Sequence, residues 1–394
     1  LLKINAGFQA NNRMEDEGGG HISLNMLLST LLYNLQWSKT IHPKVEFILS
    51  QSSTLENNTN FGARKIIPDA WMAEFSGSGF FKVNLNRKVI AEFGLGLNSK
   101  WIKTILTPGV NSADKVIAPF SKNWISANGL AGLVFNPTAE WNIKLNASSG
   151  FRAPNLAELS SNGLHEGIFT YEIGDPGLKS EQNINAAADV SYTQDWVSFA
   201  VAGFYNRFYN YIYLQPTNRD FYGFPVFLFR QQNAQLYGGE FEWKLTPQQK
   251  AKGLEFNLGV STVIGKTDDG NYLPFIPATR LRSFARYEHD ISQKVRAVFG
   301  SIGLDYVFQQ SKPAPNEKPT GSYYLLSASA GVKFTLTRGT FIISLACNNL
   351  LGAKYFDHLS RFKNYGIYNI GRDIVLRLSV PLLFNYSTKP KNKK

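Results

Sequence analysis

The chain has 394 residues, of which 43% are hydrophobic, 14% aromatic and 18% charged. This composition excludes bulk disorder, because disordered chains are poorer in aromatic residues and richer in charge. A single cysteine, Cys347, excludes a disulfide framework and a multi-cysteine metal site. The formal net charge is +12, but the basic residues are scattered except in the tail, so no nucleic-acid partner is expected.

The first residues already alternate apolar and polar side chains, and they carry no charged-then-apolar leader. We therefore expect the chain to be a fragment or a mature piece of a longer protein. No apolar stretch approaches the ~20 residues that a membrane helix needs. Helical membrane proteins are thereby excluded, whereas strand-built ones are not.

Alternation with a period of two dominates the rest of the chain. It is clearest in five runs, at residues 141–148, 184–192, 237–245, 254–261 and 373–380. Each run predicts a strand with one apolar and one polar face. We count about sixteen strands and no helix of three turns, so the predicted fold class is all-β.

Short and long connections alternate between these strands. The short ones lie at residues 86–88, 136–140, 194–195 and 337–339. The long ones lie at residues 11–21, 53–69, 104–120, 150–182, 215–230, 266–276, 310–320 and 351–367. A sandwich has no reason for this alternation, whereas an antiparallel up-and-down barrel has turns at one rim and loops at the other.

The seven tryptophans fall near predicted strand ends. Four lie beside short connections (Trp37, Trp141, Trp196 and Trp243), and three lie beside long loops (Trp71, Trp101 and Trp124). Two such belts are expected of an outer-membrane barrel, because indole favours the membrane interface. The alternative is a soluble barrel with tryptophans at its rims.

Several stretches resemble a known family. Residues 149–154 read SGFRAP and are followed by NLAELSSNGLHEG and YEIGDPGLKSEQN. Near the end come NNLLGAKYFDHLSRFKNYGIYNIGR and the strand IVLRLSV. Across nearly the whole chain these resemble the barrel of a TonB-dependent outer-membrane receptor. The segments HEG…YEIG and HLSR…GR are similar to receptors linked to zinc or haem uptake.

The resemblance implies residues 1–384 to be the C-terminal portion of an antiparallel transmembrane β-barrel. Residues 385–394 are expected to be a polar, lysine-rich tail. The family has 22 strands and a plug domain. About sixteen strands are counted here, so we expect the plug and about six strands to be missing. Sixteen strands close only with a changed shear; otherwise two edges stay unpaired.

The resemblance also implies a location and partners. The location is the outer membrane of a Gram-negative cell, and the partners begin with outer-membrane lipid. The TonB complex is expected to act through the missing N-terminal region. The outer-membrane assembly machinery is expected to read the last strand, where Val380, Leu382 and Phe384 alternate up to an aromatic residue.

The long loop at residues 150–182 is the best candidate for ligand binding. It carries His165, Glu166, Glu172 and Asp175, and imidazole with carboxylate oxygens suits zinc. The resemblance supports His165 in particular as a metal ligand. His358 and His21, in other predicted outer loops, are weaker metal candidates. The alternative is a solvated loop with ordinary polar residues.

Arg152, within FRAP, has two possible roles. It pairs with an inward carboxylate such as Glu158, or it contacts an anionic ligand. No G-x-S-x-G, H-E-x-x-H or P-loop motif is present, so no enzyme is expected.

The predicted function is energised uptake of a scarce nutrient, such as a metal ion or a metal chelate. Zinc, haem and siderophores are the candidate ligands, and no cofactor is required. A passive porin-like channel and a soluble β-rich binding protein are the alternatives.

Overall fold

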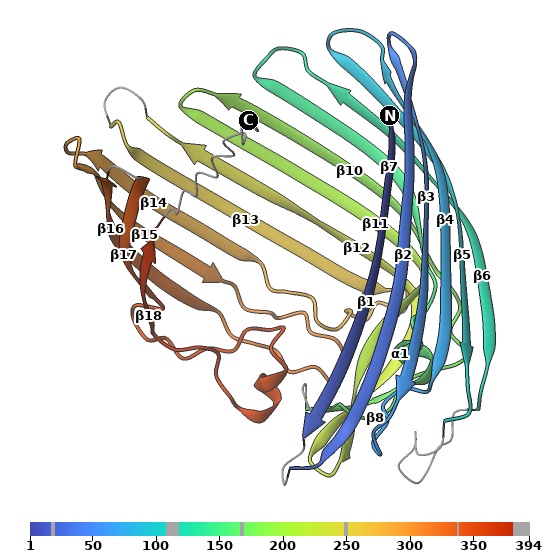
Figure 1. Cartoon of the computed structure of the whole chain (residues 1–394). Coiled ribbons are helices and arrows are strands. Elements are labelled where there is room, and N and C mark those ends of the chain that lie inside the picture. The colour runs from blue at the N-terminus through green and yellow to red at the C-terminus, as the bar shows by residue number, and fades with distance from the viewer. Residues whose placement is uncertain (17–19, 108–117, 166–168, 248–250, 337–338, 381–394) are drawn as a thin grey trace, which may run out of the picture.

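The computed structural model describes residues 1–16, 20–107, 118–165, 169–247, 251–336 and 339–380. Within these residues, sixteen strands form one antiparallel sheet that curves into a trough (Figure 1). The wall strands are β1 (Leu2–Asp16), β2 (Ile22–His42), β3 (Val45–Asn60), β4 (Ala70–Asn84), β5 (Val89–Thr104), β6 (Ser121–Phe135), β7 (Trp141–Arg152), β10 (Glu181–Gln194), β11 (Val197–Phe221), β12 (Phe224–Leu245), β13 (Leu254–Thr267), β14 (Arg280–Asp290), β15 (Val295–Val307), β16 (Tyr323–Leu336), β17 (Gly339–Asn348) and β18 (Asp373–Ser379). The prediction of about sixteen strands is confirmed.

Each wall strand pairs with its neighbour along the chain, except at one insertion. Between β7 and β10 lie helix α1 (Leu156–Ser160) and the short strands β8 (Asn162–His165) and β9 (Thr170–Ile173). Strand β10 pairs directly with β7, with Glu181 opposite Arg152. Strand β9 pairs with β8 and also adds in parallel to β12. The insertion therefore folds over one end of the trough.

The sheet is open in this structure. Among the described residues β1 pairs with β2 and β18 with β17, and no pairing joins β1 to β18. The two edges are separated in Figure 1. Of the two predicted outcomes, closure with changed shear or two unpaired edges, the described part of the chain adopts the second.

The apolar faces of the strands point outward. On β5, Phe93, Leu95 and Leu97 are 50%, 77% and 62% exposed. The intervening face carries polar groups: Asn98 accepts a hydrogen bond from Ser76 Oγ (2.7 Å) and donates to Asn128 Oδ1 (2.9 Å). A convex apolar face and a concave polar face invert the arrangement of a soluble sandwich and suit a wall in lipid.

The predicted separation of short turns and long loops at opposite rims is also confirmed, but three loop boundaries are wrong. Strand β3 continues to Asn60, where a loop was expected from residue 53. Strand β1 continues to Asp16, where a loop was expected from residue 11. The expected loop at residues 215–230 is the end of a long hairpin of β11 and β12, with Tyr222 and Gly223 at its tip. Backbone pairing continues past the membrane there because a two-stranded hairpin satisfies its own hydrogen bonds.

One tryptophan departs from the predicted belts. Trp71 and Trp101 are 50% and 37% exposed on the outward face. Trp124 instead alternates with Ile125, which is 73% exposed, and packs inward against a buried cluster. The belt interpretation is therefore wrong for Trp124, because its position in the strand places it on the concave face.

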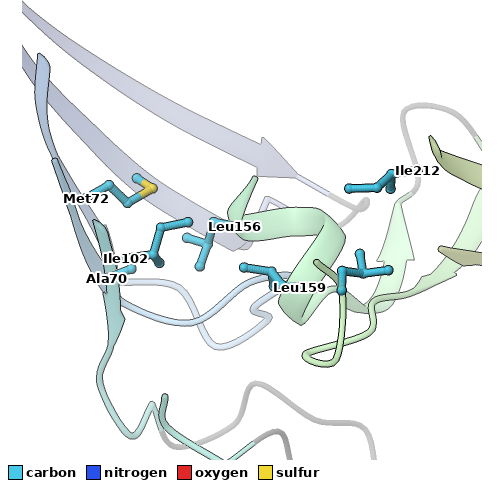
Figure 2. Close-up of a cluster of buried hydrophobic side chains, with 7 residues drawn as sticks. Ala70, Met72, Ile102, Leu156, Leu159 and Ile212 are labelled. Carbon is cyan, nitrogen blue, oxygen red and sulfur yellow. The ribbon is translucent and has the colours of Figure 1, made fainter. Parts of the chain in front are cut away.

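That buried cluster lies where the wall meets the loop layer, which is formed by the α1–β9 insertion and the other loops at the same end of the trough. Leu156 and Leu159 of α1 point toward Ala70, Met72 and Ile102 of the wall (Figure 2). Asn155 caps the N-terminus of this helix and forms a capping box with Glu158. Within the described residues, no helix is long and apolar enough to cross a bilayer.

A second short helix, η2 (Arg361–Tyr365), a 3-10 helix, lies in the connection between β17 and β18. This connection and the α1–β9 insertion reach the same end of the trough (Figure 1).

Candidate functional site

Arg152 anchors the insertion to the wall. Its Nη1 donates to both carboxylate oxygens of Glu158 (2.8 Å each), and its Nη2 donates to Glu181 Oε2 (3.1 Å). Both carboxylates are almost fully buried and also accept backbone N–H groups, from Asn155 and Ile212 (2.8 Å each). The predicted pairing of Arg152 with Glu158 is confirmed, and Glu181 is a further partner.

The hairpin of β8 and β9 brings His165 and Glu172 together. His165 Nδ1 lies 3.9 Å from Glu172 Oε2, and the Glu172 side chain is only 9% exposed. Arg13 Nη2 lies 3.3 Å from His165 Nε2. Because a guanidinium only donates, Nε2 accepts this hydrogen bond and the ring proton is left on Nδ1, facing Glu172.

The same hairpin contacts the first strand of the sheet and the connection that leads to the last one. Arg13 belongs to β1, whereas Arg361, which precedes β18, places Nη1 3.6 Å from Glu172 Oε1. Arg64, from the connection between β3 and β4, donates to the Leu164 carbonyl oxygen (2.8 Å) and to Glu15 Oε2 (2.8 Å). Three arginines therefore surround this one hairpin.

The buried charge of Arg361 is poorly compensated by hydrogen bonds and ion pairs. Its Nη1 is buried without a hydrogen bond among the described residues, although it forms the long ion pair with Glu172. Its guanidinium lies over the rings of Phe227 and Phe275, at 5.3 and 5.2 Å from their centroids. Burial lowers its pKa from the usual value for arginine, and Glu172 only partly offsets this effect.

A separate buried ionic cluster ties the last two loops together. Glu317 Oε1 lies 3.1 Å from His358 Nε2 and 3.4 Å from Lys363 Nζ, and all three side chains are at most 4% exposed. Burial alone would raise the pKa of Glu317. The hydrogen bonds from His358 and from the Ala314 N–H, with the charge of Lys363, bring this pKa below its usual value.

The remaining predicted residues lie apart from the hairpin. Asp175 is exposed and accepts the Gly177 N–H (2.7 Å), as a turn residue does. His21 is exposed, and His358 belongs to the buried cluster with Glu317. Glu166 lies outside the described residues, as do Leu382, Phe384 and the tail at residues 385–394.

The structure adds functional candidates that the sequence pattern did not single out. Arg13, Arg64 and Arg361 surround the hairpin, and Glu317 and Lys363 hold His358. Over the described part of the chain, no three histidine, cysteine, aspartate or glutamate side chains are placed to hold one metal ion. The geometry therefore offers His165 and Glu172 as a two-residue, arginine-rimmed site. Their predicted role in metal binding stays a prediction.

Comparison with known proteins agrees with the architecture. Residues 51–350 match the family model described as TonB dependent receptor-like, beta-barrel. The chain is 25% identical over 340 residues to transferrin-binding protein A of Neisseria meningitidis serogroup B, covering 81% of this chain and 33% of that protein. Its counterpart in Haemophilus influenzae is 23% identical over 361 residues, covering 84% and 34%. The chain thus spans about a third of the length of these relatives.

Solved structures share the fold. The copper transporter OprC superposes with a TM-score of 0.76 at 14% identity, covering 96% of this chain and 61% of that one. The FrpB iron transporter from Neisseria meningitidis gives 0.70 at 14% identity, covering 95% and 59%. At this identity the likeness concerns the fold.

Proposed function

Because the chain belongs to the TonB-dependent receptor-like β-barrel family, we propose that it forms part of a receptor for energised uptake of a scarce nutrient. Its family places it in the outer membrane of a Gram-negative cell, with lipid against the convex face. We propose a metal ion or metal chelate as the cargo, with zinc, haem and ferric siderophores as candidates. The protein would act as a transporter and not as an enzyme.

The observation that carries this proposal is a layer of packed loops at one end of a β-sheet wall with the family's architecture. Loops far apart in the sequence converge on the β8–β9 hairpin at one end of the trough. Such a layer suits capture of a ligand before its passage along the polar concave face. Coupling to TonB would need a segment beyond this chain, and insertion would use the outer-membrane assembly machinery. Both partners belong to the proposal.

Growth under nutrient limitation tests the uptake function. Cells lacking the complete receptor would be complemented with it and grown on limiting zinc, haem or a ferric chelate, with and without TonB. We expect rescue on at least one nutrient, and only with TonB. Unselective uptake that persists without TonB would replace the proposal with a passive channel. Recovery of the receptor in the soluble fraction without detergent would refute both membrane functions.

We further propose His165 and Glu172 as contacts for the cargo metal. Support comes from their proximity and from the low exposure of Glu172. For His165 Nε2 to ligate a cation, Arg13 must leave it. Zinc titrated into the complete receptor should therefore bind more weakly to His165→Ala and more tightly to Arg13→Gln. Equal affinity in wild type and His165→Ala would remove His165 from the site.

A further inference from the structure

A pocket of about 560 Å³ lies in the loop layer beside the last two loops. Its walls come from the end of the β11–β12 hairpin, from Phe275, and from the connections that precede β16 and β18. The volume lies within the range of small-molecule sites. No residue predicted as a ligand contact lines this pocket, so it is distinct from the His165–Glu172 pair.

One side of the pocket is aromatic. Phe227 and Phe275 line it, and the Arg361 guanidinium lies over both rings. Tyr365 is 38% exposed and is held by its hydroxyl, which donates to the Phe169 carbonyl oxygen (2.7 Å). Its ring therefore offers a fixed apolar surface at the pocket wall.

The polar side of the pocket carries three side chains that have no hydrogen-bond partner among the described residues. Asn218, Arg219 and Asn316 are exposed, and their side chains make no hydrogen bond or ion pair with any described residue. Asn218 and Arg219 fall where the pairing of β11 with β12 shifts, between Pro216 and Asp220. Such irregularities re-aim side chains and recur beside binding sites.

Among the described residues, one cation of the pocket lining has no hydrogen-bond or ion-pair partner. Lys363 is paired with Glu317, and Lys318 Nζ donates to the Asn364 carbonyl oxygen (3.1 Å). Asp220 accepts the Gly223 N–H (2.8 Å). The lining therefore holds three cations against two carboxylates, and Arg219 is the cation without a partner among the described residues.

The backbone of one pocket residue is strained. Phe275 has a φ of 58°, in the region that bulky residues rarely adopt. Phe275 is held there by its N–H, which donates to the buried Glu317 Oε1 (3.1 Å). Strain of this kind persists where surrounding structure enforces it, and it concentrates at ligand sites.

We propose that this pocket binds an acidic saccharide with a single carboxylate. A guanidinium pairs with a carboxylate through two parallel hydrogen bonds, which Arg219 is free to make. The two asparagine amides supply donors and acceptors for sugar hydroxyls, and the Tyr365 ring takes an apolar sugar face. A net lining charge of +1 matches a monoanion and disfavours a multiply charged chelate. The inference goes beyond the proposed uptake function and does not depend on it.

Direct binding tests this proposal. N-acetylneuraminic acid and its uncharged methyl ester would be titrated, by calorimetry, into the full chain in detergent micelles. We expect saturable binding of the acid and at least about tenfold weaker binding of the ester. Arg219→Gln should weaken binding of the acid about tenfold and leave the ester unchanged.

Two further variants make the test specific. Arg87→Gln removes an exposed arginine from the turn between β4 and β5 and should bind like wild type. Asn316→Gly keeps the backbone conformation, loses the amide and should bind several-fold more weakly. Absence of saturable binding, equal binding of acid and ester, or an unaffected Arg219→Gln would each overturn the proposal. None of these outcomes bears on TonB-dependent growth.

Discussion

Replacing Arg152 by methionine should release the α1 insertion from the wall. The substitution keeps a long apolar stem and removes the only cation bonded to Glu158 and Glu181 within the described residues. Those two carboxylates would stay almost buried and lose their compensating charge. We expect α1 to open locally while the wall, held by its own backbone ladder, stays folded.

The cost follows from the contacts. Removing one partner of a buried ion pair costs about 3–5 kcal/mol. Here the guanidinium is 41% exposed, and each carboxylate keeps one backbone donor, which lowers the cost. We expect about 2–3 kcal/mol, which raises the population of the opened state by roughly 30- to 160-fold.

Hydrogen exchange in detergent measures this opening. Amides of residues 156–160 should exchange faster by that factor in Arg152→Met, whereas amides in β12 should not change. Adding Glu181→Gln to Arg152→Met should recover part of the protection, because a neutral amide needs no cation. Unchanged exchange at α1, or a double variant that opens further, would refute the reasoning.

Three further predictions follow from the wall and the loops. In single-tryptophan variants, brominated lipid should quench Trp101 and leave Trp124 bright; equal quenching would contradict the inward placement of Trp124. Gly331→Ala should cost about 1–3 kcal/mol in guanidinium unfolding, because its Cβ would meet the Phe299 ring and, at 2.8 Å, a backbone oxygen. Gly321→Ala, with open space around it, is the control and should unfold like wild type. Glu317 has a lowered pKa, so its contribution to stability is present above about pH 4.3 and is lost as the pH falls through its folded value. Exchange of the Phe275 and Ala314 amides should therefore rise in acid, and Glu317→Gln should abolish this pH dependence.

Much of the wall can be predicted from the alternation of apolar and polar residues. A strand with lipid on one face and a polar concave surface on the other must alternate apolar and polar side chains. The strand number, the two rims and the outward belts could be predicted on this basis. The same alternation also predicts the position of Trp124. Ile125 lies on the outward apolar face, so Trp124, the residue before it, lies on the concave face. The belt prediction for Trp124 relied on its position near a strand end and did not use this alternation.

The loop contacts could be predicted only where partners are close in sequence. Arg152 and Glu158 are six residues apart, and a helix cap fixes their spacing. Arg13 and His165 are 152 residues apart, and they meet because the insertion folds back over the trough. No periodicity encodes such a contact, since it depends on how several loops pack together. The same holds for Arg361 and Glu172.

The β8–β9 hairpin has a mechanical consequence for the molecule. It contacts Arg13 on the first strand and Arg361 in the connection that leads to the last one, while the described strands leave these two edges unpaired. A load applied to the hairpin is therefore shared by both edges of the wall at once. The two contacts lie in series across the hairpin, so breaking either one would let the mouth of the trough widen.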